Sequence, residues 1–201
     1  MSRYILPLSL LSLSFISGSA LAITNSAGGI ISISGAISDT TCTINGGNSA
    51  DMTVVLDPIT VTDAGTTAAT VISKNQKQFS LTFSDCAPAS NPVSNLKLHF
   101  YSSSNISPSG LYLVNTSVNE NDASVAKNVG FSLSKTSTPN TAIPLNVAFD
   151  TNLTGADTGG TTGATLNLIA SYYKTNATAA KVGLLQSNVR SCIQYRDHHN
   201  R

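Results

Sequence analysis

The chain has 201 residues, in which eleven Lys and Arg side chains face ten Asp and Glu side chains, for a formal net charge of +1. A balance so close to neutral, with no basic cluster, gives no electrostatic basis for binding nucleic acid or an anionic membrane. Only 10% of the residues are charged, Trp is absent, and small polar residues dominate. This composition is typical of a durable extracellular structure more than of a catalytic scaffold.

The first 22 residues have the three parts of a secretory signal. Arg3 supplies a basic start, an apolar stretch runs from Ile5 to Ile16, and Ala20-Leu21-Ala22 offers a cleavage site. The alternative is a short membrane anchor, but the apolar run is shorter than the roughly 20 residues that a span requires. We expect cleavage after Ala22, which leaves 201 − 22 = 179 residues for one exported domain.

The next segment, residues 28–42 (GGIISISGAISDTTC), alternates apolar and polar residues as a strand does. No turn signal and no partner strand precede it. A strand-forming segment near the start of an exported chain is either a sheet edge or a segment that binds another molecule. Which of the two holds largely decides the function.

Further along, segments with a period of two alternate with turn-rich stretches, and no sustained helical period occurs. The alternating segments are Phe79–Phe83, Leu96–Phe100, Leu111–Leu113, Val129–Leu133, Leu166–Tyr172 and Val189–Tyr195. The turn-rich stretches are 45–48, 87–92, 102–110, 136–140 and 151–163. Many short strands of this kind predict an all-β, antiparallel immunoglobulin-like sandwich in a single domain.

Three cysteines are present, Cys42, Cys86 and Cys192, and an exported protein can form a disulfide. Cys42 and Cys86 each lie within or at the end of a predicted strand, so a bridge between them would link neighbouring strands. It would contribute about 3–4 kcal/mol in the chain-entropy account. Scattered cysteines without C-x-x-C spacing do not predict a zinc site, and Cys192 is left over.

Motifs for catalysis or for cofactors are missing from the sequence. It contains no G-x-S-x-G, H-E-x-x-H or phosphate-binding glycine loop, and its carboxylates are dispersed. His99 falls on the polar face of a predicted strand, where we expect it to be solvated, while His198 and His199 belong to a terminal tail. We therefore expect neither an enzyme nor a bound cofactor or metal.

Taken together, three motifs make the chain resemble pilins of the bacterial chaperone–usher pathway, in particular type 1 fimbrial major subunits. They are the alternating residues 28–42, the strand 79–86 that ends in the second cysteine, and Gly183 followed by Val189, Ile193 and Tyr195. These motifs cover both ends and the first third of the mature chain. Residues 100–165 match only in their general strand character.

The resemblance implies an incomplete immunoglobulin-like sandwich that a donated strand completes. A periplasmic chaperone first fills the groove, and the N-terminal extension of a neighbouring subunit then replaces it at the outer-membrane usher. By position, residues 23–34 would be the donor extension and residues 35–196 the pilin domain. The side chains implied to face the neighbour's groove are Ile23, Gly29, Ile31 and Ile33, and the C-terminal strand of the groove would contain Gly183, Val189, Ile193 and Tyr195.

The implied function is a structural subunit of a surface pilus. The subunit would be exported through the periplasm, polymerise with its own copies and support adhesion, and the pilus would have a host receptor as a further partner. Alternatives are a minor or tip adhesin that binds host glycan, and a fold in which residues 23–33 return as an ordinary edge strand.

Two features depart from the family. Residues 197–201 extend past the usual end and move the terminal carboxylate, and Cys192 falls on the face opposite to Ile193 and Tyr195, which would expose a thiol.

Overall fold

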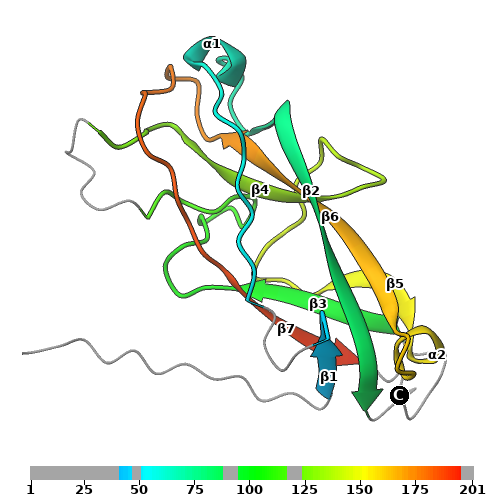
Figure 1. Ribbon diagram of the computed structural model, residues 1–201. Helices are drawn as coiled ribbons and strands as arrows, with labels where there is room; N and C mark the ends of the chain where they lie inside the picture. Colours follow the sequence, from blue (N-terminus) through cyan, green and yellow to red (C-terminus); the bar gives the residue numbers. More distant parts are fainter. Residues whose placement is uncertain (1–40, 47–50, 88–94, 117–123, 196–201) are drawn as a thin grey trace, which may run out of the picture. The chain divides into compact units, whose positions relative to one another are not determined.

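A computed structural model describes residues 41–46, 51–87, 95–116 and 124–195, all within one compact unit, Ala36–Arg201. Within this part the protein is nearly all β, so the predicted all-β, immunoglobulin-like sandwich is confirmed (Figure 1). One sheet has the order β1(Thr41–Ile44)-β2(Thr70–Ala87)-β6(Ala164–Lys174)-β4(Val129–Lys135), and the other has the order β5(Phe149–Thr154)-β3(Asn95–Tyr101)-β7(Arg190–Tyr195). Every strand pair is antiparallel.

The longest ladder joins β2 to β6 and shows why the alternating pattern forms strands. Leu81 pairs with Leu166 on the inner face, and both side chains are buried. On the outer face Thr82 pairs with Thr165, and their hydroxyls are 2.9 Å apart. A period of two therefore separates an apolar from a polar face, as the sequence predicted. The strand is longer than predicted because it continues past a register shift between Ile72 and Lys77.

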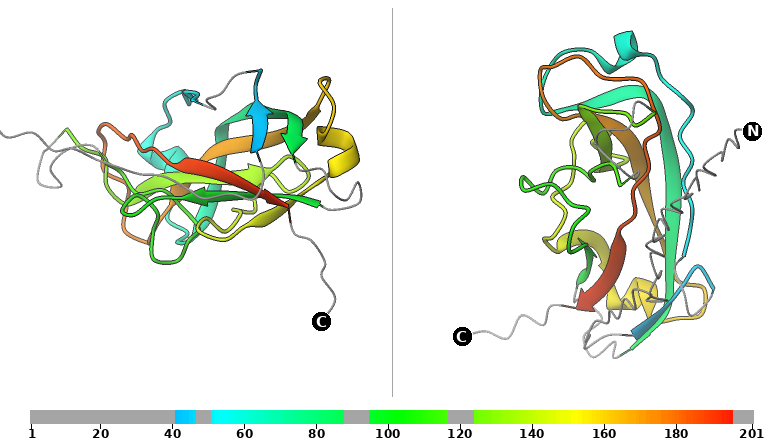
Figure 2. Two further views of the ribbon diagram at one scale, coloured as in Figure 1. Left: turned by 90° about the horizontal axis from the view of Figure 1, so that it is seen from below. Right: turned by 90° about the vertical axis from the view of Figure 1, so that its left-hand side faces the viewer.

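The core lies between the inner faces of the two sheets, which face each other in Figure 2. Its buried side chains include Leu81, Phe83, Leu96, Leu98, Phe100, Leu133, Leu166, Leu168, Ala170 and Ile193. Burial of each large apolar side chain stabilises the fold by about 1.5–3 kcal/mol. Both sheets contribute to this one core, so the second sheet depends on the first for its burial.

Strand β5 (Phe149–Thr154) overlaps the start of residues 151–163, where the sequence predicted a turn. Thr151 and Asn152 have turn-forming composition, and Asn152 has a positive φ of 62°. The segment is nevertheless a strand because Thr151 is buried and donates its hydroxyl to the carbonyl of Leu96, 2.6 Å away. A tertiary hydrogen bond here overrides local propensity.

Two helices of a single turn, α1(Val61–Ala64) and α2(Gly155–Thr158), were not predicted because one turn leaves no periodic pattern. Each begins with the same capping box. Thr60 accepts from the Asp63 amide and Asp63 accepts in return, and Thr154 and Asp157 repeat the arrangement. These hydrogen bonds to the ionised carboxylates hold the pKa of both Asp63 and Asp157 below the ordinary value of 3.8.

Candidate functional site

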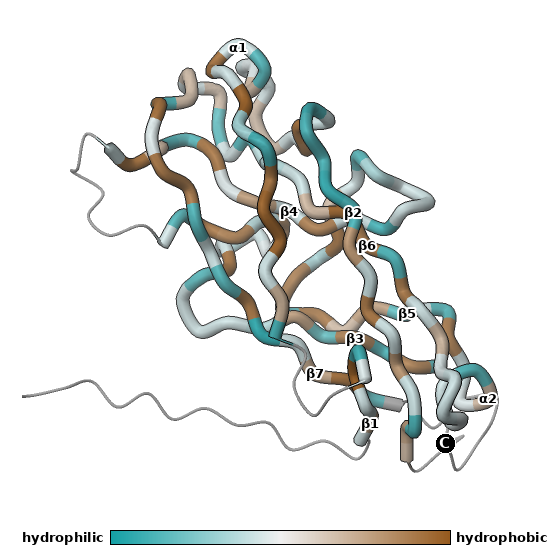
Figure 3. Tube along the Cα trace, in the orientation of Figure 1, coloured by the Kyte–Doolittle hydropathy of each residue, from teal (hydrophilic) through white to brown (hydrophobic). Residues whose placement is uncertain are grey.

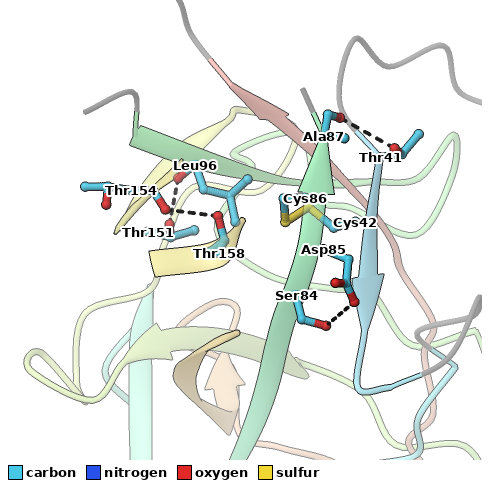
Figure 4. The surroundings of a disulfide bond; sticks show 10 residues. All are labelled: Thr41, Cys42, Ser84, Asp85, Cys86, Ala87, Leu96, Thr151, Thr154 and Thr158. Carbon is cyan, nitrogen blue, oxygen red and sulfur yellow. Dashed lines mark hydrogen bonds between the residues drawn. A yellow bond between two sulfur atoms is a disulfide. The ribbon is translucent and has the colours of Figure 1, made fainter. Parts of the chain in front are cut away.

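The disulfide fixes the start of the described domain. Cys42 and Cys86 are bonded, with Cα atoms 4.0 Å apart, so the predicted bridge is confirmed (Figure 4). It reinforces the pairing of β1 with β2, in which Thr41 lies opposite Ala87. Since Cys86 is buried, the bridge also closes one end of the core. The chain before Thr41, including the predicted first strand from Gly35, lies outside the described residues.

Strand β7 forms the other end of the site. Among the described strands it lies at the margin of its sheet, next to β3. Ile193 lies opposite Leu98 in this ladder, and Ser191 lies opposite Phe100. Because residues opposite each other share a face, Ile193 and Ser191 face the core.

The chain immediately before β7, residues 184–188, is also held on one side. The Leu184 amide donates to Ser124, the Ala126 amide donates to the Leu184 carbonyl, and the Thr116 amide donates to the Gln186 carbonyl, at 2.6, 3.0 and 2.8 Å. Main-chain groups of successive residues in an extended segment point to opposite sides. The even-numbered residues are therefore bonded toward residues 105–126, and the odd-numbered residues face the other way.

The odd-numbered residues have unused hydrogen-bonding capacity. In the described part of the chain, no partner contacts the main-chain N–H or C=O of Leu185, Ser187 or Val189. The side chain of Val189 packs against the core. Its main-chain N–H and C=O therefore point along the plane of the sheet, away from residues 105–126. We call the side of residues 185–189 that has no partner among the described residues the open edge.

Gly183 sits where the chain enters the open edge. Its φ is +154°, and a Cβ at this position would overlap the main chain of Ser124, Val125 and Ala126. Only glycine permits so close an approach. The sequence singled out Gly183, Val189, Ile193 and Tyr195 as one strand, and the structure brings them onto one continuous segment, in which Tyr195 pairs with Leu96.

A second extended segment, residues 52–56, runs along the same side of the domain as residues 184–189 in both views (Figures 1 and 2). Among the described residues, none contacts its main-chain polar groups. Val54 and Leu56 pack against the core, whereas Val55 between them is 73% exposed. Figure 3 shows this apolar run as a brown stretch of the tube. Nothing in the alternation of the sequence predicted this segment.

Side chains anchor the chain just after residues 52–56. The Asn75 amide donates to the carbonyls of Asp57 and Pro58 at 3.4 and 2.7 Å, and the Tyr172 hydroxyl donates to Asp57 at 3.2 Å. Asn75 can reach because it occupies the register shift of β2 with a φ of 56°. Burial raises the pKa of Tyr172, and the nearby Asp57 adds to the rise.

Two asparagine amides replace a neighbouring strand along residues 184–188. The Asn115 amide group donates to the Leu184 carbonyl at 2.8 Å, and its oxygen accepts from the Gln186 amide at 3.2 Å. Asn105 donates to the Asn188 carbonyl at 3.0 Å. Because an amide side chain offers both a donor and an acceptor, it can mimic a ladder partner.

Lys174 fixes the loop that leads into the open edge. Its side chain is fully buried, and its ammonium donates to the carbonyls of Asn128, Asn176 and Thr178. Burial lowers the pKa of Lys174. Three carbonyls around one ammonium tie the loop to the chain just before β4.

The expectation of a solvated His99 was wrong. His99 is half-buried, its Nε2 is buried without a partner among the described residues, and its Nδ1 is 3.8 Å from the Cys192 sulfur. Cys192 is a free cysteine on the face opposite to Ile193, as predicted, but it is half-buried and not fully exposed. Burial raises the pKa of its thiol, which lowers the fraction of reactive thiolate.

The predicted donor residues Ile23, Gly29, Ile31 and Ile33 lie outside the described residues, as do the signal and the tail after Tyr195. Within the described ranges, no group of three or more His, Cys, Asp or Glu side chains could hold a metal ion. The helices found there are too short to cross a membrane. The chemistry that the described site offers is therefore unpaired main chain beside apolar side chains.

Comparison with known proteins gives the family. The sequence matches the family described as fimbrial protein over residues 31–196. No curated protein matches the chain. Among solved structures it is similar to the P pilus rod subunit PapA, at 12% identity and a TM-score of 0.46, over 83% of this chain and 100% of that chain. The corresponding values for the P pilus adaptor subunit PapF are 12%, 0.39, 77% and 95%. Since the family match spans most of the sequence, the chain belongs to the fimbrial protein family.

Proposed function

We propose that this protein is a structural subunit of a chaperone–usher pilus that polymerises by donor-strand exchange. Family membership supports a pilus subunit at the cell surface. The single observation that supports the mechanism is the open edge, where Leu185, Ser187 and Val189 have no main-chain partner in the described ranges and lie beside the core. An edge of this kind is a template for an added strand.

The surroundings of the open edge are apolar. Leu184 and Val182 are 70% and 75% exposed at its start, and Val55 is 73% exposed on the neighbouring segment. Exposed apolar side chains next to unpaired main chain favour aggregation unless another strand covers them. This explains why such a subunit would need a periplasmic chaperone until the usher delivers it to the growing fibre.

The strand that covers the open edge is residues 23–33 of a neighbouring copy. This segment alternates apolar and polar residues, and Ile23, Ile31 and Ile33 share one face. Their burial would contribute about 5–9 kcal/mol at ~1.5–3 kcal/mol each. New main-chain hydrogen bonds would add about 0.5–1.5 kcal/mol apiece. Ordering of the strand offsets part of this sum, yet the remainder supports a long-lived joint without covalent bonds.

The test is a pair of substitutions on adjacent donor residues, made in cells that express the chain with its assembly genes. Ile31→Asp would place a charge in the neighbour's core and should abolish fibres while the subunit is still secreted to the periplasm. The matched control Ser32→Asp lies on the opposite face and should leave fibres intact. Electron microscopy and the yield of sheared fibres measure both.

Deletion of residues 23–33 gives the broader test. It should leave a secreted domain that still binds the chaperone but forms no fibres. Normal fibres from this deletion would refute donor-strand exchange, because no other segment of the chain is proposed to fill the edge.

A further inference from the structure

Four asparagines of the chain lie in Asn-x-Ser/Thr motifs, in which the side-chain amide of an exported protein can accept an oligosaccharide. They are Asn105, Asn115, Asn152 and Asn176. The motif alone is a weak indication in a chain rich in Asn, Ser and Thr, where it arises by chance. The structure separates the four by the exposure of each asparagine and by the hydrogen bonds of its amide.

Three of the four amides already have a part in the fold. Those of Asn105 and Asn115 hold residues 184–188, and both side chains are half-buried. Asn176 is exposed, but its amide donates to the side-chain oxygen of Asn128 at 2.9 Å. A sugar on any of these three nitrogens would break or crowd hydrogen bonds that order the surrounding chain.

Asn152 differs in both respects. It is exposed, and its side-chain amide has no hydrogen-bond partner among the described residues. Residues 151–153 of β5 bulge out of the ladder, because between the flanking pairs β3 has only Leu96. Thr151 is buried and fixes this bulge through its hydrogen bond to the Leu96 carbonyl (Figure 4). A bulge re-aims a side chain, and Asn152, with a φ of 62°, is directed away from the ladder.

An acidic residue accompanies this motif. Asp150 lies two positions before Asn152, and its carboxylate accepts from the Asn152 main-chain amide at 2.7 Å and from the Asn95 side chain at 2.8 Å. The corresponding positions before the other three asparagines hold Ser103, Leu113 and Lys174. A carboxylate beside the acceptor offers a basic site on a transferase an electrostatic contact that the other three motifs lack.

We propose that Asn152 is the N-glycosylation acceptor of this chain, modified after export by a membrane oligosaccharyltransferase with a polyprenyl-pyrophosphate-linked oligosaccharide. Its Nδ2 forms a C–N bond to the anomeric carbon of the first sugar, while the C–O bond from that carbon to the pyrophosphate breaks. The pyrophosphate leaves with the bonding electron pair, and one amide proton passes to a base of the transferase. Nothing is oxidised or reduced. This inference goes beyond the proposed function and needs only export.

The position of β5 allows a transferase to reach the motif. Among the described strands β5 is marginal in its sheet, next to β3, so it can open locally with little loss of core burial. The Thr154 hydroxyl, which the motif also requires, donates to the Asp157 carboxylate in an exposed cap that such opening releases. β5 and β7 flank β3 on opposite sides, so a sugar on Asn152 leaves β7 uncovered.

The test is expression of the full chain in bacteria that contain an oligosaccharyltransferase and a lipid-linked oligosaccharide of known mass. The secreted subunit should gain the mass of one oligosaccharide, and the peptide that contains Asn152 should carry it. Asn152→Asp tolerates the positive φ and should reduce the modified fraction at least tenfold. The matched control Asn176→Asp, at the other exposed motif, should leave the modified fraction unchanged.

Two outcomes would overturn the proposal. One is an oligosaccharide on Asn105, Asn115 or Asn176 in place of Asn152. The other is an unmodified subunit from cells that modify a known acceptor protein expressed alongside it. Should Asn152→Asp fail to accumulate, peptide mapping of the unchanged chain still locates the sugar. Neither outcome touches the proposed function, which the deletion of residues 23–33 tests through fibre formation.

Discussion

Strands β6 and β7 both contribute to the core, but they differ in how their sides are occupied. β6 pairs with β2 on one side and with β4 on the other, and Leu168 at its centre has no exposed surface. Among the described strands β7 has β3 as its neighbour, and in this part of the chain the main chain of Leu185 and Val189 in the preceding row has no partner.

Under the proposed function, this difference separates the strands that fold the domain from the edge that would join it to other subunits. The ladder of β6 is complete within the chain, so its stability does not depend on a partner. The open edge lacks a strand that the described residues do not supply. Changes on the β6 side should therefore alter the stability of the subunit, and changes at the open edge should alter assembly more.

The largest expected effect is on the sheet that contains β6, where the disulfide joins β1 to β2. Replacement of Cys42 and Cys86 by alanine opens a loop of 44 residues and should lower the free energy of unfolding by about 4 kcal/mol. Urea unfolding of the purified subunit measures it. Cys192→Ser is the matched control and should change the value by less than about 0.5 kcal/mol. An equal loss in Cys192→Ser would assign the effect to thiol removal in general.

Core truncation compares β6 and β7 directly. Leu168→Ala should cost about 3–4 kcal/mol, because both sheets enclose Leu168 and a cavity remains. Ile193→Ala should cost less, about 2 kcal/mol, in the isolated subunit, and more once the subunit is in a fibre, where the donor strand would complete its surroundings. Equal costs in the isolated subunit would mean that the chain's own N-terminal segment already fills the edge.

Gly183→Ala examines the entry to the open edge. The added Cβ would overlap the main chain of Ser124 to Ala126 at a φ unsuited to alanine, which should cost about 1–2 kcal/mol. The matched control is Gly160→Ala, where a Cβ would meet nothing within 4 Å. Hydrogen exchange should show faster opening of residues 184–188 in the first variant alone. Faster exchange throughout the domain would contradict a local role.

The smallest expected effect is a loss of stability in acid at the N-terminal caps of the helices α1 and α2. The pKa values of Asp63 and Asp157 are lowered in the fold, so the stability from each cap is fully present above the ordinary value of 3.8. It is lost as the pH falls through the lowered pKa. Thermal unfolding should therefore shift downward in acid, and less so in Asp63→Asn or Asp157→Asn. An unchanged acid shift in both variants would place its origin in other carboxylates.

Strict alternation let the sequence predict β6 and β7, because burial of one sheet face imposes a period of two. The same reasoning missed β5, since Thr151 is buried through a hydrogen bond to Leu96 and not through apolar contact. It also missed residues 52–56 and the roles of Asn75, Asn105 and Asn115. Those contacts join positions far apart in the chain, and a single polar residue has no periodic signature.

The amide clamps of Asn105 and Asn115 have a kinetic consequence. They hold residues 184–188 extended before any partner arrives, so the receiving side has little conformational freedom left to lose on docking. If the subunit polymerises by the proposed strand exchange, the time needed to add a subunit would be set by how quickly the incoming strand pairs with the edge and by how quickly the previous occupant leaves. On that proposal, a pilus built on such a template would grow fast from one end and yet hold each finished joint for long periods.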